Sequence, residues 1–379
     1  MAPTEPPSSA DVVVVGAGAI GCSVAYHLAR RGCRDVLVLE RASVGAGASG
    51  RGNGGIRSQF GLVTEVRFSL ASLAFFERFE EEMGVSCGFV RTGYLFLIQS
   101  QPELGQFRRD AAMQNRLGAD TRLIGPDEIR SIVPGLRVDD VLAGAWGPKD
   151  GFARPPDVVR AYAARARAMG VRIAERTEVR GLRLGGGRVR SVETDRGPVE
   201  PGVVVDAAGA QAAAVARLAG VDVPVRPRRR HLFLTGPVTG LRHPLPLIIE
   251  PDFGFYVRSE GDALLMSPGD VGVVEDDADA QPVDWGLAET TLRKAAHRLP
   301  EAAGVRIERG WAGLRPLTPD DHAIIDWLPG VENMLCAVGF GGHGFQHSPA
   351  AGQTVAELVL DRRSSIDIAP LRLSRFAAS

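Results

Sequence analysis

Residues 11–21 read DVVVVGAGAIG, and this stretch decides the fold class of the 379-residue chain. The valines at 12–15 form a continuous β-branched run, which is typical of a strand buried on both faces. A glycine turn and helical apolar spacing over about 20–31 follow, and residues 35–40 (DVLVLE) form a second such strand. Because crossovers of this kind are right-handed, the sequence predicts a βαβ unit with parallel strands.

The glycine turn has the spacing GxGxxG between a strand and a helix, which is the context that dinucleotide binding requires. Gly16 permits the tight turn, Gly18 lets the backbone approach a pyrophosphate, and Gly21 lets the helix pack closely on the strand. Glu40 ends the second strand, where its carboxylate can accept a hydrogen bond from a ribose hydroxyl. The pattern predicts a dinucleotide site, and a glycine turn without a ligand is the alternative.

Two further stretches favour FAD over NAD, a choice that Glu40 alone does not make. Residues 45–57 (GAGASGRGNGGIR) offer glycines and short polar side chains where a longer, permanently held cofactor needs backbone contacts. Residues 205–210 (VDAAGA) predict the end of another buried strand, with small residues that can lie against a cofactor. We therefore expect FAD.

The composition excludes several classes of function. The chain is 45% apolar with a formal net charge of −1, so no global field would draw it to nucleic acid or an anionic membrane. Lys149 and Lys294 are the only lysines, against 42 arginines. An active-site cation other than these lysines or a histidine must therefore be an arginine.

Cysteine usage and the first residues favour a cytoplasmic location. The four cysteines show no CxxC pair and no zinc-ligand spacing, which fits a reducing compartment. The start, MAPTEPPSSA, has neither a basic nor an apolar segment and is expected to be a frayed tail instead of a signal peptide. No apolar run approaches the roughly 20 residues that a membrane span needs, so we expect no span.

The pattern along the chain predicts an α/β fold in which a strand-rich domain interrupts a Rossmann-like one. We assign residues 11–88, 148–222 and 306–362 to the nucleotide-binding domain, and residues 89–147 and 223–305 to the inserted α+β substrate domain. Helices are expected at about 64–83, 102–117, 126–132, 155–170 and 286–298. Strands are expected at 89–98, 177–184, 188–195, 203–207, 231–235, 254–258, 263–267 and 334–338.

Several ordered motifs carry a family resemblance that covers nearly the whole chain. They are GAGAIG (16–21) with Glu40-Arg41, ASGRGNGGIR (48–57), VVDAAGA (204–210), WAGLRPLTPDDHAIID (311–326) and GFGGHGFQHSPAAGQ (339–353). With them the chain resembles the FAD-dependent D-amino-acid-oxidase-like family, in its glycine oxidase and sarcosine oxidase branch. The resemblance implies a Rossmann-like FAD domain and an isoalloxazine that faces an inserted antiparallel sheet.

The motifs and the resemblance together predict the residues that contact the cofactor. They are Gly16, Ala17, Gly18, Ala19, Ile20, Gly21, Glu40, Arg41, Ala48, Ser49, Gly50, Asn53, Gly54, Gly55, Ile56, Val179, Ala208, Gly209, Gly313, Gly341, Gly342, His343, Gly344, Phe345 and Gln346.

The glycine-rich loop at 339–345 precedes the last helix, for which we expect Ser348 as cap and Pro349 in the first turn. By the resemblance, the positive end of this helix faces the pyrimidine side of the flavin and stabilises its reduced form. His343 and His347 have HxxxH spacing without the glutamate of HExxH, so we expect no metal. A structural or flavin-contacting His343 is the preferred interpretation.

Three residues are candidates for the catalytic site. Arg315 matches the arginine that grips the substrate carboxylate in glycine and D-amino-acid oxidases, and a guanidinium offers a planar, permanently charged fork for that group. Tyr256 lies on a strand that the resemblance turns toward the flavin, although core packing explains it as well. Arg57 is expected near the flavin, with a structural role as the alternative. The basic run 226–231 is expected to be a solvated edge or domain contact, or else to bind a second carboxylate.

The chain departs from the monomeric sarcosine oxidases at two points. Gly313 stands where those enzymes attach their flavin through a cysteine, so we expect non-covalent FAD. Gln346 replaces a lysine after the GHGF loop, and the region 254–270 contains no lysine that could promote reaction with oxygen. Carboxylate binding through Arg315 is therefore closer to the glycine oxidase pattern.

The resemblance implies oxidation of the C–N bond of a small amino acid or N-substituted glycine. A hydride passes from the α-carbon to flavin N5, and the resulting imine is hydrolysed to an amine plus glyoxylate or an aldehyde. Oxygen, which would give hydrogen peroxide, or another electron acceptor completes the cycle, and an oligomer is possible. The alternatives are a dehydrogenase of the proline or dimethylglycine type, a 2-hydroxy-acid oxidoreductase, and a non-catalytic FAD-containing subunit.

Overall fold

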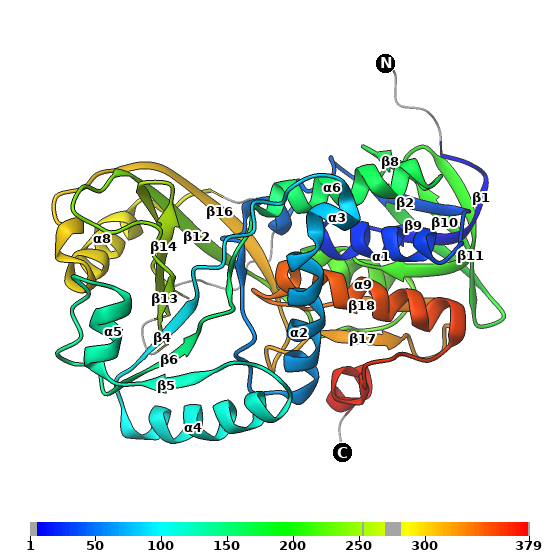
Figure 1. Ribbon diagram of the computed structural model, residues 1–379. Helices are drawn as coiled ribbons and strands as arrows, with labels where there is room; N and C mark the ends of the chain where they lie inside the picture. Colours follow the sequence, from blue (N-terminus) through cyan, green and yellow to red (C-terminus); the bar gives the residue numbers. More distant parts are fainter. Residues whose placement is uncertain (1–5, 252–253, 270–281, 378–379) are drawn as a thin grey trace.

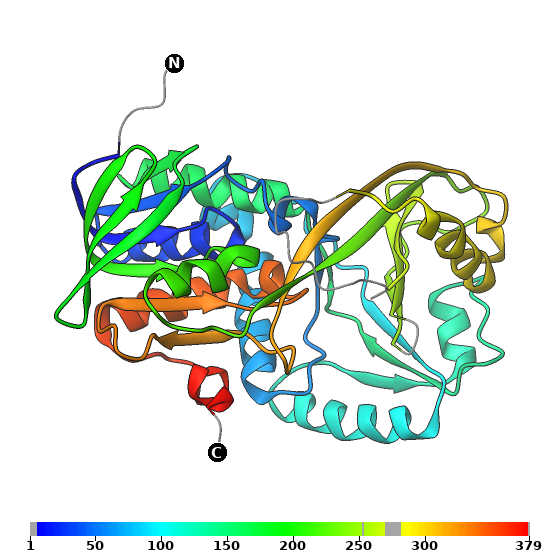
Figure 2. The same ribbon diagram turned by 180° about the vertical axis from the view of Figure 1, so that it is seen from behind.

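The computed structural model describes residues 6–251, 254–269 and 282–377. The chain folds into two lobes, each built on one eight-stranded sheet, and it crosses between them several times (Figures 1 and 2). Strands close to the N-terminus and close to the C-terminus belong to the same lobe. This arrangement confirms the predicted fold class of a Rossmann-like unit interrupted by a second sheet.

The first sheet has a parallel centre. Its path runs β17 (Ile324–Trp327), β18 (Met334–Val338), β11 (Gly197–Asp206), β1 (Ser9–Val15), β2 (Val36–Glu40) and β8 (Arg172–Glu175). The antiparallel strands β9 (Val179–Gly185) and β10 (Arg188–Thr194) extend it from β11. β1 pairs in parallel with both β2 and β11, so the ends of these three strands meet at the glycine turn.

Both faces of the first sheet are covered, which explains its continuous apolar strands. One face of β1 and β2 packs in a core with α1 (Ala19–Arg30), α6 (Pro155–Ala168) and α9 (Gly344–Asp361). The other face packs against α7 (Ala212–Leu218) and the β9–β10 hairpin. α2 (Val63–Glu77) packs against α9, and α3 (Phe79–Met83) packs against α6. The sequence predicted a single helix over 64–83, whereas the structure divides it at Arg78.

The second sheet is mixed and is built mostly from the middle of the chain. Its order is β16 (Ile307–Leu317), β12 (Arg226–Pro237), β15 (Ala263–Ser267), β14 (Phe255–Glu260), β13 (Leu247–Glu250), β4 (Tyr94–Ile98), β6 (Ala143–Gly147) and β5 (Arg122–Ile124). The described pairs are antiparallel except for β13 with β4. The remaining helices are α4 (Gln101–Arg116), α5 (Pro126–Ile132) and α8 (Gly286–Arg298), and β3 (Gly55–Ile56) pairs with β7 (Gly151–Phe152).

Three expectations need correction. The basic run belongs to the twelve-residue strand β12, which the prediction limited to 231–235. β16 pairs with β12 in the second sheet, although its residues fall in the range 306–362 assigned to the first domain. Residues 89–93 are not a strand, apart from one bridge between Val90 and Phe152. In the first two cases the pairing between distant strands, which local pattern does not reveal, sets the boundary.

The last helix begins earlier than the sequence suggested. α9 starts at Gly344 with His343 at its N-cap, so Ser348 and Pro349 are interior residues instead of cap and first turn. The Ser348 hydroxyl donates to the carbonyl of Phe345, one turn back. The free N–H groups of this helix therefore lie within the glycine-rich loop itself.

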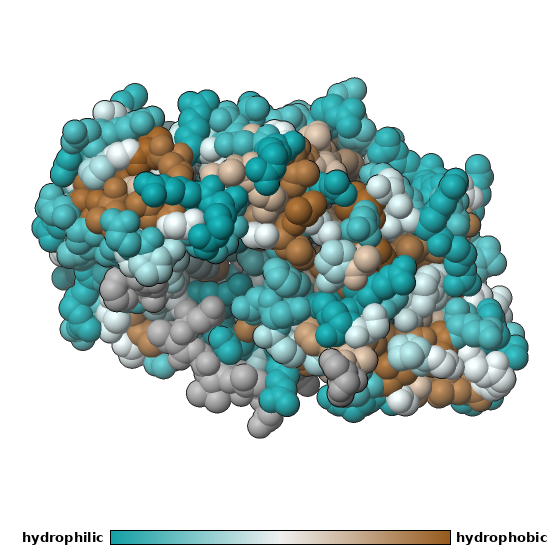
Figure 3. All heavy atoms as spheres, turned by 90° about the horizontal axis from the view of Figure 1, so that it is seen from below, coloured by the Kyte–Doolittle hydropathy of each residue, from teal (hydrophilic) through white to brown (hydrophobic). Residues whose placement is uncertain are grey.

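Within the residues that the structure describes, no helix is both long and apolar enough to cross a membrane. On the face shown in Figure 3, hydrophilic residues cover much of the surface, and that surface is hollowed where the two lobes meet. Residues 1–5 of the expected frayed tail and residue 270 of the lysine-free region lie outside the described residues.

Candidate active site

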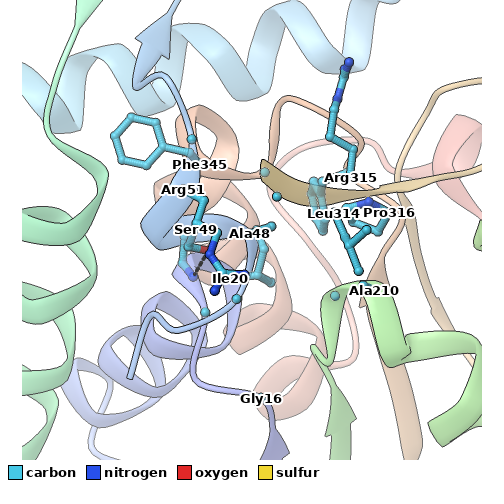
Figure 4. Close-up of a pocket in the computed structure, with 18 of the residues that line it drawn as sticks. Gly16, Ile20, Ala48, Ser49, Arg51, Ala210, Leu314, Arg315, Pro316 and Phe345 are labelled. Atoms are coloured by element: carbon cyan, nitrogen blue, oxygen red, sulfur yellow. Dashed lines mark hydrogen bonds between the residues drawn. The ribbon is translucent and has the colours of Figure 1, made fainter. Parts of the chain in front are cut away.

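A pocket of about 830 Å³ lies between the two sheets. Its walls come from the glycine turn, the loop 46–57, residues 177–180 and 207–211, strands of the second sheet, and the loop 339–346. Figure 4 shows Ile20 and Ser49 on one side of this space and Leu314 and Arg315 on the other. Segments separated by about 300 residues in sequence therefore form one site.

The glycine turn has the geometry that its sequence predicts. Gly16 adopts φ +102°, in the left-handed region, and a Cβ there would lie 2.6 Å from the carbonyl oxygen of Ala207. A Cβ on Gly21 would overlap the carbonyl oxygen of Gly16. These two glycines allow α1 to begin directly behind the ends of β1 and β11, with its N-terminus toward the pocket.

Two side chains hold the nucleotide end of the pocket in shape. The Glu40 carboxylate accepts hydrogen bonds from the backbone N–H groups of Ala17 and Ala42, each at 2.8 Å. The Ser49 hydroxyl accepts one from the N–H of Ala19 at 2.9 Å, and this bond ties the 45–57 loop to the first turn of α1. A carboxylate and a helix N-terminus thus flank the cavity, at the places where a ribose and a pyrophosphate would be recognised.

These features fit FAD. The pocket is lined by glycines whose missing side chains leave room, such as Gly209, for which an added Cβ would meet no atom within 4 Å. The first turn of α1 contains no acidic residue and its N-cap Gly18 makes no side-chain cap, so its positive end remains suited to an anion. The cavity continues from here to the second sheet, as an extended dinucleotide requires.

The other end of the pocket is built around Arg57. Its guanidinium donates to the carbonyl of Gln59, lies 3.1 Å from Nε2 of His343, and stacks 4.0 Å from the centre of the Phe60 ring. The backbone N–H of Arg57 donates to the side chain of Gln346 at 3.1 Å. Arg57 therefore joins the 45–57 loop to the start of α9.

Asp150 holds the end of the 45–57 loop through Ser58, the residue that follows Arg57. Its carboxylate accepts hydrogen bonds from the N–H and the hydroxyl of Ser58, at 3.1 and 3.0 Å. The carboxyl is completely buried, and burial raises its pKa from 3.8 to about 7. The two bonds from Ser58 favour the ionised form but do not offset the burial.

His343 is a neutral residue of the site. Burial is the largest cause that lowers its pKa well below 6.5, and the positive charges of Arg57 and Arg315 lower it further. His347 instead packs inside the protein, where its Nε2 lies 2.9 Å from the Ser69 hydroxyl. The HxxxH spacing thus corresponds to one residue at the pocket wall and one in the core.

Arg315 on β16 contacts the glycine-rich loop, which lies against this strand through a hydrogen bond from the N–H of Gly341 to the carbonyl of Pro316. A Cβ on Gly342 would lie 2.7 Å from Cζ of the Arg315 guanidinium, so the arginine occupies the space that the glycine leaves open. Gly342 lies two residues before the first residue of α9. The guanidinium and the N-terminal end of the helix therefore act together on one region of the pocket, which is strongly favourable to an anion.

Tyrosines of the second sheet complete this end of the site. Tyr256 on β14 lines the pocket, and the Tyr94 hydroxyl lies close to Gly55. Arg258, which alternation places on the same side as Tyr256, does not line the pocket; it donates to the carbonyl of Asn53 and pairs with Glu260. Burial raises the pKa of Tyr94 to about 12, so its hydroxyl stays protonated.

The structure brings most of the predicted site residues to the pocket wall, whereas Ala17, Gly21, Gly50 and Ile56 lie behind it. The wall contains Gly16, Gly18, Ala19, Ile20, Glu40, Arg41, Ala48, Ser49, Asn53, Gly54, Gly55, Arg57, Val179, Ala208, Gly209, Tyr256, Gly313, Arg315, Gly341, Gly342, His343, Gly344, Phe345 and Gln346. That these residues bind cofactor or substrate stays a prediction.

Sequence reasoning missed other lining residues, including Arg51, Tyr94 and Gln211. Tyr94 begins the apolar run YLFLI, which a local pattern assigns to the core. Arg230 was visible only as part of the basic run 226–231. No spacing along the chain showed that these side chains share one cavity.

The fold and the site define a class of protein, the flavin-dependent oxidoreductases with a dinucleotide fold. Comparison with known families agrees: residues 11–358 match the family described as DAO, FAD dependent oxidoreductase. The chain belongs to this family.

Individual relatives align with nearly the whole chain. It is 28% identical to mouse (Mus musculus) mitochondrial sarcosine dehydrogenase over 99% of its own length, but it spans only 42% of that protein. The structure matches an L-proline dehydrogenase from P. horikoshii with a TM-score of 0.92 and 30% identity, covering 98% of each chain. It matches a glycine oxidase from Geobacillus kaustophilus with a TM-score of 0.87 and 26% identity, covering 98% of this chain and 100% of the other.

Proposed function

We propose that the protein oxidises the C–N bond of an amino acid or an N-substituted glycine. The observation that carries this proposal is Arg315, whose guanidinium lies over Gly342 next to the N-terminus of α9. A carboxylate bound there receives a bidentate fork and is favoured by the helix dipole. The names of the similar proteins, which act on sarcosine, L-proline and glycine, support a substrate of this class.

The residues of the site act by binding and orientation. Arg315 fixes the carboxylate, and this single anchor determines where the neighbouring carbon and its hydrogen lie. Strands β12, β13 and β14 of the same sheet line the pocket beside Arg315 and keep water from the reacting carbon. Neutral His343 holds Arg57 without adding a charge. We assign no side chain as a general base, so the substrate reacts as the neutral amine.

FAD, when bound, supplies the acceptor for two electrons. Oxidation removes the α-hydrogen of the substrate with its bonding pair, and the lone pair on nitrogen closes the C=N bond. Water then adds to the carbon, the C–N bond breaks, and the products are an amine and an oxo acid or aldehyde. Positioning and electrostatic stabilisation supply the catalysis in this scheme.

We further propose that FAD is held without a covalent bond. Gly313 offers no nucleophile, and none of the described residues that line the pocket is a cysteine. The cysteines of the described chain are all free thiols, in keeping with a cytoplasmic location. Oxygen or a second protein or quinone accepts the electrons in the next step.

A dehydrogenase is the second candidate function. The similarity in structure to the L-proline dehydrogenase favours it, as does the absence of lysine from the described wall of the pocket. In that case oxygen would reoxidise the reduced protein slowly and an artificial quinone quickly.

An anaerobic experiment tests the proposal. The yellow holoenzyme is mixed with glycine, sarcosine, dimethylglycine, L-proline, D-alanine, a long-chain N-alkylglycine and a 2-hydroxy acid, while the oxidised flavin absorbance is followed. We expect an amine to remove the absorbance, and admitting air then separates oxidase from dehydrogenase. Reduction by the hydroxy acid alone would overturn the proposal and retain the fold.

A further inference from the structure

We propose that the substrate carries a second carboxylate, which Arg230 binds while Arg315 holds the first. The inference rests on the proposed function and narrows its substrate to amines with two carboxylates, such as N-carboxyalkyl amino acids. It starts from an arginine whose neighbours in the basic run do not reach the pocket. Arg230 lines the pocket together with Leu232, whereas Arg228 and Arg229 do not line it.

The register of the two strands places the two arginines side by side. Arg230 on β12 lies opposite Gly313 on β16, and Arg315 is two residues farther along β16. Residues that are diagonal in this way share one face of the sheet, with Cα atoms roughly 7–8 Å apart. Their long side chains can therefore bind two groups of the same small molecule.

The Arg230 guanidinium is held at the wall by an aromatic ring. Its Cζ lies 5.7 Å from the centre of the Tyr256 ring, within the range of a cation–π contact. Tyr256 lies on β14, and Pro251 and Gly254 near it also line the pocket. Arg230 thus faces the part of the cavity walled by the second sheet, where the substrate is expected.

The described pocket wall has its carboxylates at the nucleotide end, where Arg41 and Arg180 also line it. Its carboxylates belong to Glu40 and Glu178, which border the strands of the first sheet at the nucleotide end. Among the described residues on the side of β12 and β16, four arginines and no carboxylate line the cavity: Arg51, whose side chain lies against Gly313, Arg57, Arg230 and Arg315. Each guanidinium at the wall can bind a carboxylate of the ligand, so Arg230 and Arg315 on one face of the sheet favour a ligand with two negative charges over one with a single charge.

Two unreactive acids of equal length test the second carboxylate directly. Glutarate and valerate both have five carbons, and only glutarate is charged at both ends. We titrate each into the FAD-loaded protein and measure the change in the visible flavin spectrum and in the melting temperature. We expect glutarate to bind at least 10-fold more tightly than valerate.

A matched pair of variants assigns the effect to one residue. Arg230→Gln should reduce the preference for glutarate to less than 3-fold and leave the affinity for valerate nearly unchanged. Arg229→Gln, on the neighbouring position of β12, should keep the preference. If Arg230→Gln yields no folded protein, Arg230→Lys replaces it and should retain part of the preference because the charge remains.

Two results would overturn the inference: equal affinities for the two acids in the unaltered protein, or an undiminished preference in Arg230→Gln. Flavin reduction is measured separately, with sarcosine and iminodiacetate as secondary amines that carry one and two carboxylates. Reduction by neither amine, with a glutarate preference that depends on Arg230, contradicts the proposed oxidation alone. Equal reduction by both amines without a glutarate preference contradicts only the second carboxylate.

Discussion

The two ends of the pocket differ in whether backbone atoms or side-chain atoms form most of the wall. At the nucleotide end, glycines and backbone N–H groups form the wall, and Glu40 and Ser49 only brace them. At the opposite end, side chains of arginine and tyrosine from five separate segments form the wall. The first end is sensitive to any atom that is added, and the second is sensitive to a charge or hydroxyl that is removed.

The largest effect is expected where an atom is added at the nucleotide end. In Gly21→Ala the new Cβ would overlap the Gly16 carbonyl, so α1 must move away from the strand. We expect the purified variant to retain less than about a tenth of the normal FAD content, measured from the ratio of flavin to protein absorbance. Gly125→Ala is the control, because a Cβ there meets no atom within 4 Å. Full FAD content in Gly21→Ala would contradict the close packing.

Removing a positive charge at the opposite end should leave the cofactor bound and weaken substrate binding. Arg315→Met keeps most of the side-chain volume but leaves the carboxylate without its fork. We expect the rate of flavin reduction divided by substrate Kd to fall about 100-fold or more, since a lost buried charge partner costs roughly 2–5 kcal/mol. The readout is anaerobic stopped-flow absorbance, with FAD content unchanged.

Arg309→Met is the matched control for this variant. Arg309 lies on the same strand but is exposed and packs over Trp311. It should reduce flavin like the unaltered protein. A loss shared by both variants would indicate damage to β16 instead of a lost carboxylate anchor.

A hydroxyl at the substrate end should matter less than the charge. Tyr256→Phe removes one polar group from the pocket wall, and a single net hydrogen bond contributes about 0.5–1.5 kcal/mol. We expect flavin reduction to slow about 3- to 10-fold. Tyr94→Phe serves as the comparison, because the Tyr94 hydroxyl faces Gly55. An unchanged rate in Tyr256→Phe would assign this tyrosine to packing.

The smallest effect concerns stability and its pH dependence at Asp150. The folded protein retains a proton on this carboxyl up to about pH 7, whereas the unfolded chain loses it near pH 4. The contribution of Asp150 to the free energy of unfolding therefore falls as the pH rises from about 4 to 7. Asp150→Asn keeps an acceptor for Ser58 without the charge, and we expect a melting temperature roughly 2–4 °C higher at pH 8.

The gain from Asp150→Asn should disappear as the pH approaches 4, and thermal unfolding at several pH values measures it. Asp139→Asn, at an exposed position, should show no such gain. Asp206 gives the equivalent test at the nucleotide end, since burial raises its pKa to about 8 and extends the window accordingly. A gain that is constant with pH would show that Asp150 is ionised when folded at all of these values.

The nucleotide end was readable from sequence because its determinants are local. Gly16, Gly18 and Gly21 lie within six residues, and the strands on either side have continuous apolar runs. The turn conformation and the close approach of α1 to β1 follow from this short segment alone. The helix α9 shows the limit of such reasoning: Ser348 and Pro349 suggested its start, yet α9 begins at Gly344 in the glycine loop.

The substrate end could be predicted only in part. The resemblance singled out Arg315, Arg57 and Tyr256, and all three line the pocket. The sequence did not predict strand β16, so its register with β12, and with it the position of Arg230 beside Arg315, was not visible before the structure. Cross-strand pairing joins residues about 85 apart, and no periodicity along the chain records it.

The sequence by itself determined the class of fold, the strand–glycine–helix unit and the kind of cofactor, because hydrophobic period and glycine spacing act within a few residues. The tertiary structure alone decided which arginines share a cavity, which buried carboxyls hold a proton, and where α9 presents its N-terminus. These properties depend on desolvation and on distances between segments far apart in the chain, which exist only after the two sheets have packed together.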